Sequence, residues 1–258
     1  MSFLPLFTTS MDQLRQHTAE IRKGIREANG IPGVVVENFL SPDECAEILR
    51  GVYILEPYWR RGTYDGDFIL GRSWYTAIDN REIMDYFDEA PFFNQLIRDS
   101  FPELLEKIMA VARTLTNQEE VQIRPGWAGP GITIFRPPSC TAETGGSCHI
   151  DYDGISKRMV DVPEGLEMFS FMLPISMPED AAGLYVWPEI YQRFHHKRYF
   201  DEILDPEGER FTIPYSVGNL LGIHSLRVHQ IEPFDGDIDR VVVTFHLGKL
   251  DGKWIVWF

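Results

Sequence analysis

The feature that most constrains the fold is a series of short apolar runs after about residue 120, separated by turns that contain Gly and Pro. A succession of short strands with regular turns is typical of a sandwich or a jelly roll. The Asp-Gly pair at residues 251–252 predicts a tight hairpin before a last strand at residues 253–258. The other expected strands cover residues 132–135, 168–173, 184–187, 210–214, 219–223 and 240–247.

The first 120 residues read as mainly helical. Residues 10–28 carry apolar side chains at helical spacing and end at an Asn-Gly pair that favours a helix C-cap. The apolar run at residues 33–36 predicts a short buried strand. The Ser-Pro-Asp-Glu motif at residues 41–44 predicts a helix start, because it combines an N-cap serine, a proline at the first helical position and a capping-box glutamate.

Residues 81–116 predict two or three further helices, interrupted at Pro91 and Pro102. No linker-like segment divides the helical part from the β-rich part. We therefore expect one α+β domain of 258 residues, in which a helical part, about 1–120, packs on a jelly-roll part, about 121–258.

The charge balance narrows the choice of partners. The chain has 24 Lys and Arg against 39 Asp and Glu, a formal net charge of −15, which disfavours binding to nucleic acids and to anionic membranes. No window approaches the roughly 18 uncharged apolar residues that a membrane span requires. The start lacks a basic stretch and a cleavage site, and the three cysteines form no CxxC pair. We expect a cytoplasmic protein, and its oligomeric state stays open.

The sharpest local signal is the His-x-Asp motif of His149 and Asp151. In a strand these two positions point to the same face, so an imidazole and a carboxylate converge. They are two thirds of a facial triad for non-heme Fe(II). Alone the motif is weak, because the tripeptide is frequent by chance and its side chains can simply form a hydrogen bond at a strand end.

A second signal lies downstream, where His229 precedes Arg240 by 11 residues. The two residues are expected on neighbouring strands joined by the loop at residues 232–239. Three ligands on one face of an octahedron leave three sites open, which a bidentate 2-oxo acid and dioxygen can fill. A buried guanidinium then binds the remote carboxylate of the 2-oxo acid. The pattern therefore combines three candidate metal ligands, His149, Asp151 and His229, with a cation, Arg240, that can bind a co-substrate.

The four residues and the spacing of the last two resemble the Fe(II)/2-oxoglutarate dioxygenase superfamily, with its double-stranded β-helix (jelly-roll or cupin-like) core. The strand followed by residues 40–45 is similar to the opening of many small members. Residues 182–186, the strand after Gly218 and residues 254–257 resemble a subgroup of stand-alone small-molecule hydroxylases and halogenases. The resemblance covers residues 31–258.

The resemblance implies that His149, Asp151 and His229 hold Fe(II) and that Arg240 binds 2-oxoglutarate, with O2 as the second co-substrate. It implies hydroxylation of an unactivated C–H, coupled to decarboxylation of 2-oxoglutarate to succinate and CO2. The implied substrate is a small molecule, such as an amino acid, an amino-acid derivative or a secondary metabolite.

Two positions depart from the pattern of that family. Its halogenases replace the carboxylate by a small residue, whereas Asp151 is present here, which implies hydroxylation or another oxidation. Many members have Ser or Thr two residues after the arginine, where this chain has Val242. Thr244 lies on the same strand face and is the candidate replacement for co-substrate binding.

Other histidines compete for these roles. His224 lies five residues before His229, and we prefer His229 as the ligand because of its distance from Arg240. His246 shares the face of Arg240, where it either supports a metal ligand or is an ordinary core histidine. The histidines at residues 195–196 lie in a polar stretch and are expected in a loop.

Further residues are candidates for the pocket. Thr133 and Phe135 share a strand face and either line the site, with Thr133 near the co-substrate, or fill the barrel interior. Tyr152, Asp153 and Trp187 are candidate substrate contacts, although Asp153, which precedes Gly154, is better suited to a turn.

Arg136 and Arg227 either bind a substrate carboxylate or are exposed charges. The segments at residues 126–131 and 136–146 are either lids or plain connectors.

Three alternative functions share these residues. A peptidyl or protein hydroxylase has the same metal site and requires a wide groove. A non-catalytic cupin-type binding protein uses the ligands for structure or sugar binding. A zinc hydrolase uses two histidines and one aspartate but gives Arg240 no co-substrate.

Overall fold

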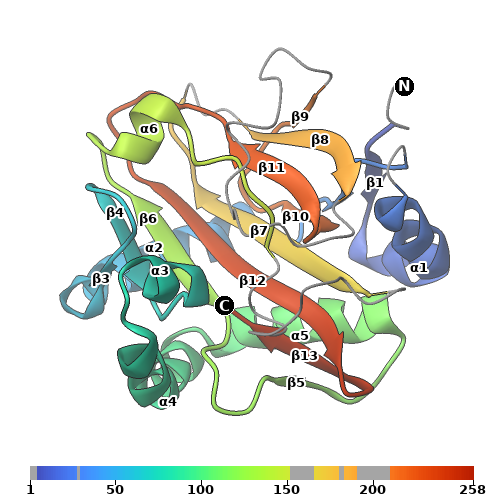
Figure 1. The fold of residues 1–258 in the computed structure, drawn as a ribbon, viewed down its shortest axis with the longest axis horizontal. Coiled ribbons are helices and arrows are strands. Elements are labelled where there is room, and N and C mark those ends of the chain that lie inside the picture. The colour runs from blue at the N-terminus through green and yellow to red at the C-terminus, as the bar shows by residue number, and fades with distance from the viewer. Residues whose placement is uncertain (1–4, 28–29, 152–165, 180–182, 191–209) are drawn as a thin grey trace.

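The computed structural model describes residues 5–27, 30–151, 166–179, 183–190 and 210–258 (Figure 1). The helices are α1 (Met11–Arg26), α2 (Pro42–Ile54), α3 (Trp74–Asp79), α4 (Ile83–Ser100), α5 (Pro102–Thr116), α6 (Cys140–Thr144) and the 3-10 turn η1 (Glu56–Tyr58). The strands before residue 150 are β1 (Phe7–Thr9), β2 (Val34–Val36), β3 (Arg60–Arg61), β4 (Asp67–Leu70), β5 (Val121–Ile123) and β6 (Gly131–Phe135). The later strands are β7 (Met168–Ser176), β8 (Leu184–Ile190), β9 (Phe211–Ile213), β10 (Leu220–His224), β11 (Arg227–Ile231), β12 (Arg240–Leu250) and β13 (Lys253–Trp257).

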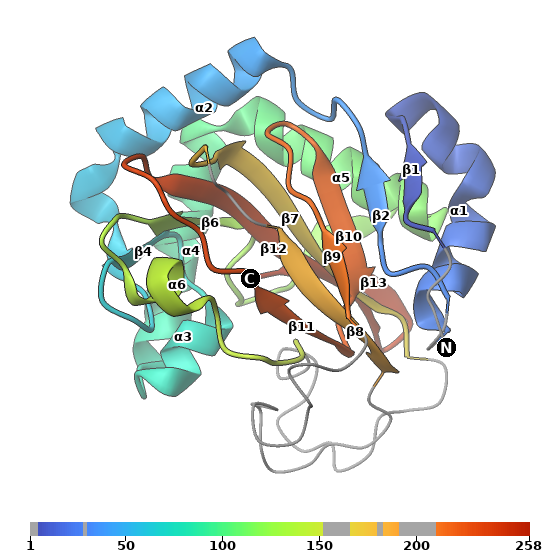
Figure 2. The same cartoon turned by 90° about the horizontal axis from the view of Figure 1, so that it is seen from above.

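The strands form two sheets. The large sheet has 10 strands with the order β1-β2-β10-β7-β12-β6-β4-β3, while β13 pairs with β12 and with β5. The small sheet has three strands in the order β11-β8-β9. Figure 2 shows α1, α2 and α5 on one side of the large sheet and the small sheet on the other.

Strand β12 shows how the sequence separates the two faces of the large sheet. Val241, Val243, Phe245 and Leu247 pack in one hydrophobic cluster with side chains from α1, α2 and α5. The alternate residues of β12 face the small sheet, because successive side chains of a strand point to opposite faces. Val242, for example, packs with residues of β8, β9 and β10. The site described below lies on this second face.

Most expected elements are confirmed, and the differences have physical reasons. The strands expected after residue 130 are present, and the hairpin at residues 251–252 joins β12 to β13. The expected break at Pro91 is wrong, because α4 runs through it. The buried side chains of α4, which include Tyr86 and Phe93, pack on neighbouring elements, and such packing contributes more to helical stability than local propensity does.

The sequence pattern did not indicate β1, β3, β4, β5 or the short helices α3 and α6. These strands have two to four residues and are too short to show a period. As a result, the part expected to be helical also supplies β1 to β4 to the large sheet. The strand expected at His229 is β11, but it lies in the small sheet, whereas Arg240 begins β12 of the large sheet. Each helix in the described part of the chain is too short or too polar to span a lipid bilayer.

The capping box of α2 provides a stability test. Ser41 accepts from the backbone N–H of Glu44, whose carboxylate accepts from the backbone N–H of Ser41. We expect Ser41→Ala to lower the free energy of unfolding by about 1 kcal/mol, measured by urea denaturation. Ser10 is the matched control, because it occupies the N-cap of α1 without a side-chain capping bond among the described residues. An equal loss in Ser10→Ala would contradict this reading.

Candidate active site

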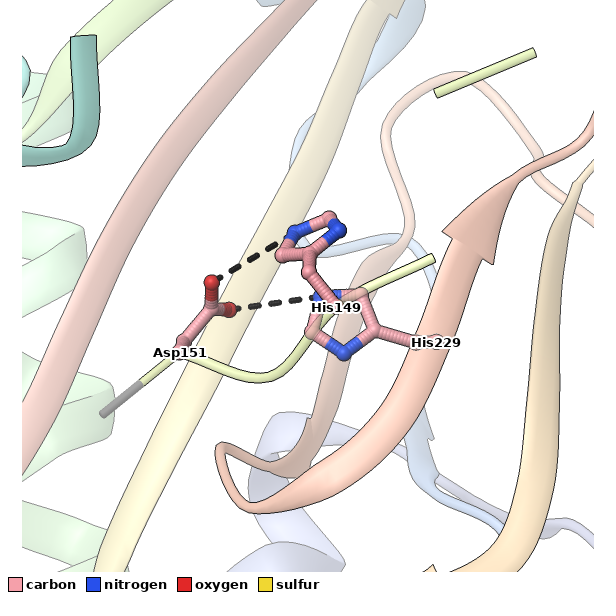
Figure 3. A group of neighbouring side chains, drawn as sticks. All are labelled: His149, Asp151 and His229. Atoms are coloured by element: carbon pink, nitrogen blue, oxygen red, sulfur yellow. Dashed lines mark ion pairs between the residues drawn. The ribbon is translucent and has the colours of Figure 1, made fainter. Parts of the chain in front are cut away.

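Backbone pairing brings the His-x-Asp motif beside β11. His149 and His229 form an antiparallel bridge, and the N–H of each donates to the carbonyl of the other at 3.0 Å. The N–H of Asp151 donates to the carbonyl of Ser225 at 2.7 Å. Figure 3 shows the three side chains, His149, Asp151 and His229, turned toward one another. Residues 80 positions apart in the chain therefore meet through main-chain hydrogen bonds.

The three side chains are spaced as metal ligands. One ligand atom from each of His149, Asp151 and His229 lies within 4.8 Å of the others. The Asp151 carboxylate oxygens lie 3.6 Å from Nε2 of His149 and 3.4 Å from Nε2 of His229. Ligands about 2 Å from a common ion are about 3 Å apart on one octahedral face, so a small inward movement accommodates a divalent ion.

Both imidazoles are oriented by their other nitrogen. Nδ1 of His149 lies 2.6 Å from the carbonyl oxygen of Ser147, and Nδ1 of His229 lies 2.8 Å from that of Arg227. A carbonyl only accepts, so each Nδ1 carries a proton, and each Nε2 is the ring nitrogen turned to the centre where a metal ion can bind. A metal-binding histidine usually makes such a second contact through its other ring nitrogen, and the contact fixes its tautomer. The donor set thus fits a divalent transition metal.

Asp151 is held by a hydroxyl network that the sequence analysis did not identify. Ser170 on β7 donates to Asp151 Oδ2 at 2.7 Å, and its oxygen lies 2.8 Å from Ser225 Oγ and 3.1 Å from His246 Nδ1. Ser170 is a buried polar residue inside an otherwise apolar strand, and this pattern is the sequence signal that could have identified it. His246 therefore supports a candidate ligand, one of the two roles expected for it.

The carboxylate of Asp151 stays ionised in this environment. Burial raises its pKa, but attraction and a hydrogen bond from His229, with further attraction from His246 and His149, outweigh burial and hold the pKa well below its usual value. A divalent ion displaces the proton that His229 donates to Asp151, and the site then offers one negative charge and two neutral nitrogen donors, a set that suits iron.

Arg240 lies in the same cavity as the His-Asp-His group. It is 1% exposed, and its guanidinium carbon lies 4.8 Å from the ring centre of Tyr215, 5.0 Å from Phe234 and 5.4 Å from Phe135. Tyr215 also forms a hydrogen bond with it. Its Nε and Nη1 atoms have no hydrogen-bond partner among the described residues. A buried cation with unmatched donors is costly unless a ligand carboxylate pairs with it.

The cavity lies between the two sheets and has a volume of about 210 Å³. Thr133, Phe135 and Thr244 line it, as the sequence analysis expected of candidates for pocket and co-substrate contacts. Trp187 is placed elsewhere, in a cluster with Cys148, Ile150, Leu226 and Val228. Tyr152 and Asp153 lie outside the described residues, as do the histidines at residues 195–196.

His224, the alternative metal ligand, and Arg136, a candidate substrate contact, both make contacts of a structural kind. His224 is buried outside this cavity lining and accepts from the N–H of Leu226, and burial lowers its pKa to about 4. Arg136 forms ion pairs with Glu56 and Asp239 on the partly exposed surface.

Arg227 is fully buried, not an exposed charge. Its guanidinium donates to the carbonyls of Ile25, Glu27, Trp187 and Pro188, so it joins the end of α1 to β8. These contacts indicate a structural role for Arg227.

Asp67 is a cavity residue that the sequence analysis did not identify. It is 6% exposed, and its Oδ2 accepts from Thr141 at 2.6 Å. Desolvation raises the pKa of its carboxyl from 3.8 to about 6, against the effect of hydrogen bonds from Thr141 and Ser139. No motif marks this residue, because β4 is too short to be recognised from its pattern.

The raised pKa of Asp67 gives a pH dependence with a definite sign. Between about pH 4 and 6 the folded protein keeps a proton that the unfolded chain has lost, so stability falls as pH rises through this window and is then constant. We expect Asp67→Asn to be more stable than the wild type by about 3 kcal/mol at pH 7.5 and nearly equal to it at pH 4. Urea denaturation at both values checks this, and the same difference at both values would contradict it.

Comparisons with known proteins identify the fold. No protein-family model matches the chain, and no curated protein matches it. It is similar to the N-substituted L-amino acid dioxygenase from Burkholderia ambifaria (11% identity, 96% of this chain, 92% of that one, TM-score 0.56). It is also similar to the epimerase SnoN in complex with Fe3+, alpha ketoglutarate and nogalamycin RO (13% identity, 89% of this chain, 82% of that one, TM-score 0.54). A third similar structure is SnoK, a non-heme alpha ketoglutarate dependent carbocyclase from nogalamycin biosynthesis (14% identity, 90% of this chain, 87% of that one, TM-score 0.51). At these identities the likeness shows that this chain has a mixed α/β fold shared with non-heme alpha ketoglutarate enzymes.

Proposed function

We propose that this protein is an Fe(II)- and 2-oxoglutarate-dependent dioxygenase that hydroxylates a small molecule, with a single jelly-roll domain. The observation that carries the proposal is Arg240, a buried guanidinium with unmatched donors in the same cavity as His149, Asp151 and His229. A metal site alone also suits a zinc hydrolase or a cupin-type binding protein. A co-substrate with a remote carboxylate explains why a cation with unmatched donors is buried beside the metal group.

The chain's own residues have defined tasks in this proposal. Nε2 of His149, Nε2 of His229 and the Asp151 carboxylate hold iron, which with 2-oxoglutarate and O2 supplies the oxidising chemistry. Asp151 offsets one of its positive charges. Arg240, with the hydroxyl of Tyr215, binds the remote carboxylate of 2-oxoglutarate.

The rest of the cavity orients the co-substrate and the substrate. Thr133 and Thr244 offer hydroxyls along the same cavity wall, and Phe135 and Phe234 shield the guanidinium from water. Exclusion of water strengthens the charge pairing at Arg240.

The substrate is proposed to be a small molecule, such as an amino acid, an amino-acid derivative or a secondary metabolite. A volume of about 210 Å³ is below the range of drug-sized ligand pockets and supports this over a peptidyl or protein hydroxylase, which requires a wide groove. The similar structures include an amino acid dioxygenase. The sparse cysteines support a cytoplasmic location.

Hydroxylation is the proposed reaction, and the mass of the product tests it. The similar structures include an epimerase and a carbocyclase, so the assay must separate the outcomes. Incubation of a metabolite mixture with enzyme, iron, ascorbate and 2-oxoglutarate is expected to give a product heavier by one oxygen atom. Epimerisation leaves the mass unchanged, and oxidative ring closure lowers it by two hydrogens.

A spectroscopic experiment tests the cofactors independently of the substrate. Anaerobic addition of Fe(II) and 2-oxoglutarate is expected to give a weak visible charge-transfer band. A cupin-type binding protein gives no such band, and a zinc hydrolase is indifferent to 2-oxoglutarate. Absence of the band with the iron-loaded protein would overturn the proposed function.

A further inference from the structure

Strand β12 lines one side of the cavity and gives it two ends. Every second side chain of a strand points to the same face, and four such residues of β12 line the cavity: Arg240, Val242, Thr244 and His246. Arg240 pairs with Phe135 of β6. Thr244, four residues or about 13 Å further along the extended strand, pairs with Gly131. The cavity therefore has an Arg240 end and, past Thr244, a His246 end.

The metal group lies toward the His246 end. Ser170 is the cross-strand partner of His246 and donates to Asp151 Oδ2 at 2.7 Å. Under the proposed function 2-oxoglutarate extends from Arg240 to the metal, so it occupies the Arg240 end. The carbon that is oxidised must lie beside the metal and beyond the co-substrate, because the reacting atoms have to be close together. The reacting part of the substrate therefore belongs at the His246 end.

Two aromatic rings line the His246 end. The ring centre of Tyr75, on α3, lies 5.2 Å from that of His246 in an edge-to-face contact. Phe258 follows Trp257, which is the cross-strand partner of His246, and its carbonyl accepts from the N–H of Trp74 at the start of α3. The side chains of Tyr75 and Phe258 both line the cavity. A substrate group beside the metal is therefore next to these two rings.

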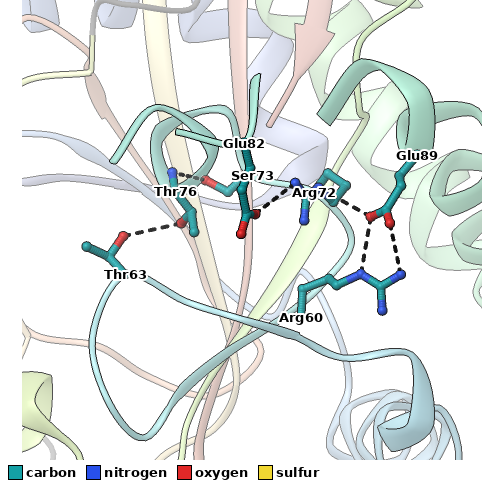
Figure 4. Close-up of polar contacts among 7 residues, drawn as sticks. All are labelled: Arg60, Thr63, Arg72, Ser73, Thr76, Glu82 and Glu89. Atoms are coloured by element: carbon teal, nitrogen blue, oxygen red, sulfur yellow. Dashed lines mark hydrogen bonds and ion pairs between the residues drawn. The ribbon is translucent and has the colours of Figure 1, made fainter. Parts of the chain in front are cut away.

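The polar groups near α3 are bonded to one another (Figure 4). The hydroxyl of Ser73 accepts from the N–H of Thr76 at 3.5 Å. The hydroxyl of Thr63 lies 3.5 Å from Thr76 Oγ1 and 3.4 Å from Asp79 Oδ2. Each of these groups already has a partner inside the protein, so a ligand gains little by bonding to it. An apolar group of the substrate is therefore better suited to this end than a polar one.

Helix α3 is held rigidly from the side away from the cavity. Arg72, just before α3, is 7% exposed and forms ion pairs with Glu82 at 3.2 Å and Glu89 at 3.6 Å, and Arg60 reaches Glu89 at 3.1 Å (Figure 4). These contacts fix the start of α3 before any ligand binds. A preorganised wall selects ligands by size instead of adapting to them.

Phe258 is fixed as firmly as α3. Its N–H donates to the carbonyl of Ala128 at 3.0 Å, and its carbonyl accepts from the N–H of Trp74 at 3.1 Å and from the hydroxyl of Tyr86 at 3.0 Å. Its ring lies directly against Gly131 of β6, where a Cβ atom would overlap the ring. The ring therefore has no space to withdraw toward β6 when a large ligand enters.

We infer that the reacting part of the substrate is an apolar group no larger than one aromatic ring, that it binds at the His246 end, and that Phe258 limits its size. The inference rests on the proposed function and narrows its substrate class. An unactivated C–H belongs to such an apolar group, and the two rings at this end offer it apolar contacts.

The test compares a one-ring and a two-ring probe, benzyl alcohol and 2-naphthalenemethanol, on the protein loaded with Mn(II) and saturated with 2-oxoglutarate. Paramagnetic broadening of the probe signals by Mn(II) gives dissociation constants for binding near the metal, without turnover, and the Zn(II)-loaded protein is the diamagnetic reference. The wild type is expected to bind benzyl alcohol at least about tenfold more tightly than the two-ring probe, because the second ring overlaps Phe258.

Variants that change the cavity in opposite directions locate that preference. Phe258→Ala is expected to remove it, and Phe258→Leu to reduce it about threefold, because both widen the His246 end. Gly131→Ala is expected to weaken the binding of benzyl alcohol about tenfold, because the new methyl group turns the ring of Phe258 into the cavity. Phe135→Ala is the matched control, since Phe135 lines the Arg240 end on the same strand as Gly131. Its preference is expected to equal that of the wild type.

The outcomes that overturn the inference differ from failure of the proposed function. A wild type that binds Mn(II) and 2-oxoglutarate but broadens neither probe, or both equally, excludes the inference alone. A preference that survives in Phe258→Ala, or that Phe135→Ala loses to the same extent, excludes Phe258 as the residue that limits size. Should Phe258→Ala not fold, Phe258→Leu and Gly131→Ala decide the question by their opposite effects. A protein that binds Mn(II) but not 2-oxoglutarate shows that the proposed function has failed.

Discussion

Replacing His229 by alanine is expected to weaken Fe(II) binding and succinate formation by more than about 100-fold, the range that even outer partners of metal ligands reach. His229 contributes one of the three ligand atoms of the metal group and is 4% exposed. A water molecule that took the place of its imidazole would not be held in the same orientation. Anaerobic calorimetric titration with Fe(II) measures the affinity, and succinate release from 2-oxoglutarate measures turnover.

His224 supplies the matched control for His229. It is 3% exposed and lies on β10, and its Nδ1 accepts from the N–H of Leu226, an acceptor that asparagine can reproduce. His224→Asn is expected to keep its Fe(II) affinity within about threefold of the wild type, because His224 is not part of the metal group. If His224→Asn lost the metal and His229→Ala kept it, the assignment of the ligand would be wrong.

Arg240→Met is expected to weaken 2-oxoglutarate binding by about 100-fold or more while leaving the free protein no less stable. The guanidinium is buried with unmatched Nε and Nη1 donors, so its removal costs no complete set of hydrogen bonds. The free energy of unfolding without ligands is expected to stay constant or to rise by about 1 kcal/mol. Calorimetric titration with 2-oxoglutarate and urea denaturation measure the two quantities.

Arg227 is the matched control for Arg240, since both are fully buried arginines on strands. Arg227 donates to four backbone carbonyls, two of them at the end of α1 and two in β8. Arg227→Met is therefore expected to lower the free energy of unfolding by about 3 kcal/mol, as seen by urea denaturation. A larger loss of stability in Arg240→Met than in Arg227→Met would show that Arg240 is structural.

The opposite roles of Arg227 and His229 could not be read from their spacing. Residues two apart in a regular strand share a face. The pairing of β11 with β8 shifts register between Arg227 and His229, and this irregularity accompanies different surroundings for the two side chains. His229 lines the cavity, while Arg227 reaches the carbonyls at the end of α1. Irregularities of this kind re-aim side chains near functional sites.

The sequence by itself determined the features that a few neighbouring residues encode: the capping box at Ser41, the hairpin at residues 251–252 and the His149-x-Asp151 pair. It also supplied the spacing of His229 and Arg240. Only the tertiary structure decided that Ser170 holds Asp151, that the Arg240 guanidinium has unmatched donors, and that Asp67 lines the cavity. The reason is that these relations depend on strand register and on packing between sheets, and a one-residue change of register moves every side chain of a strand to the other face.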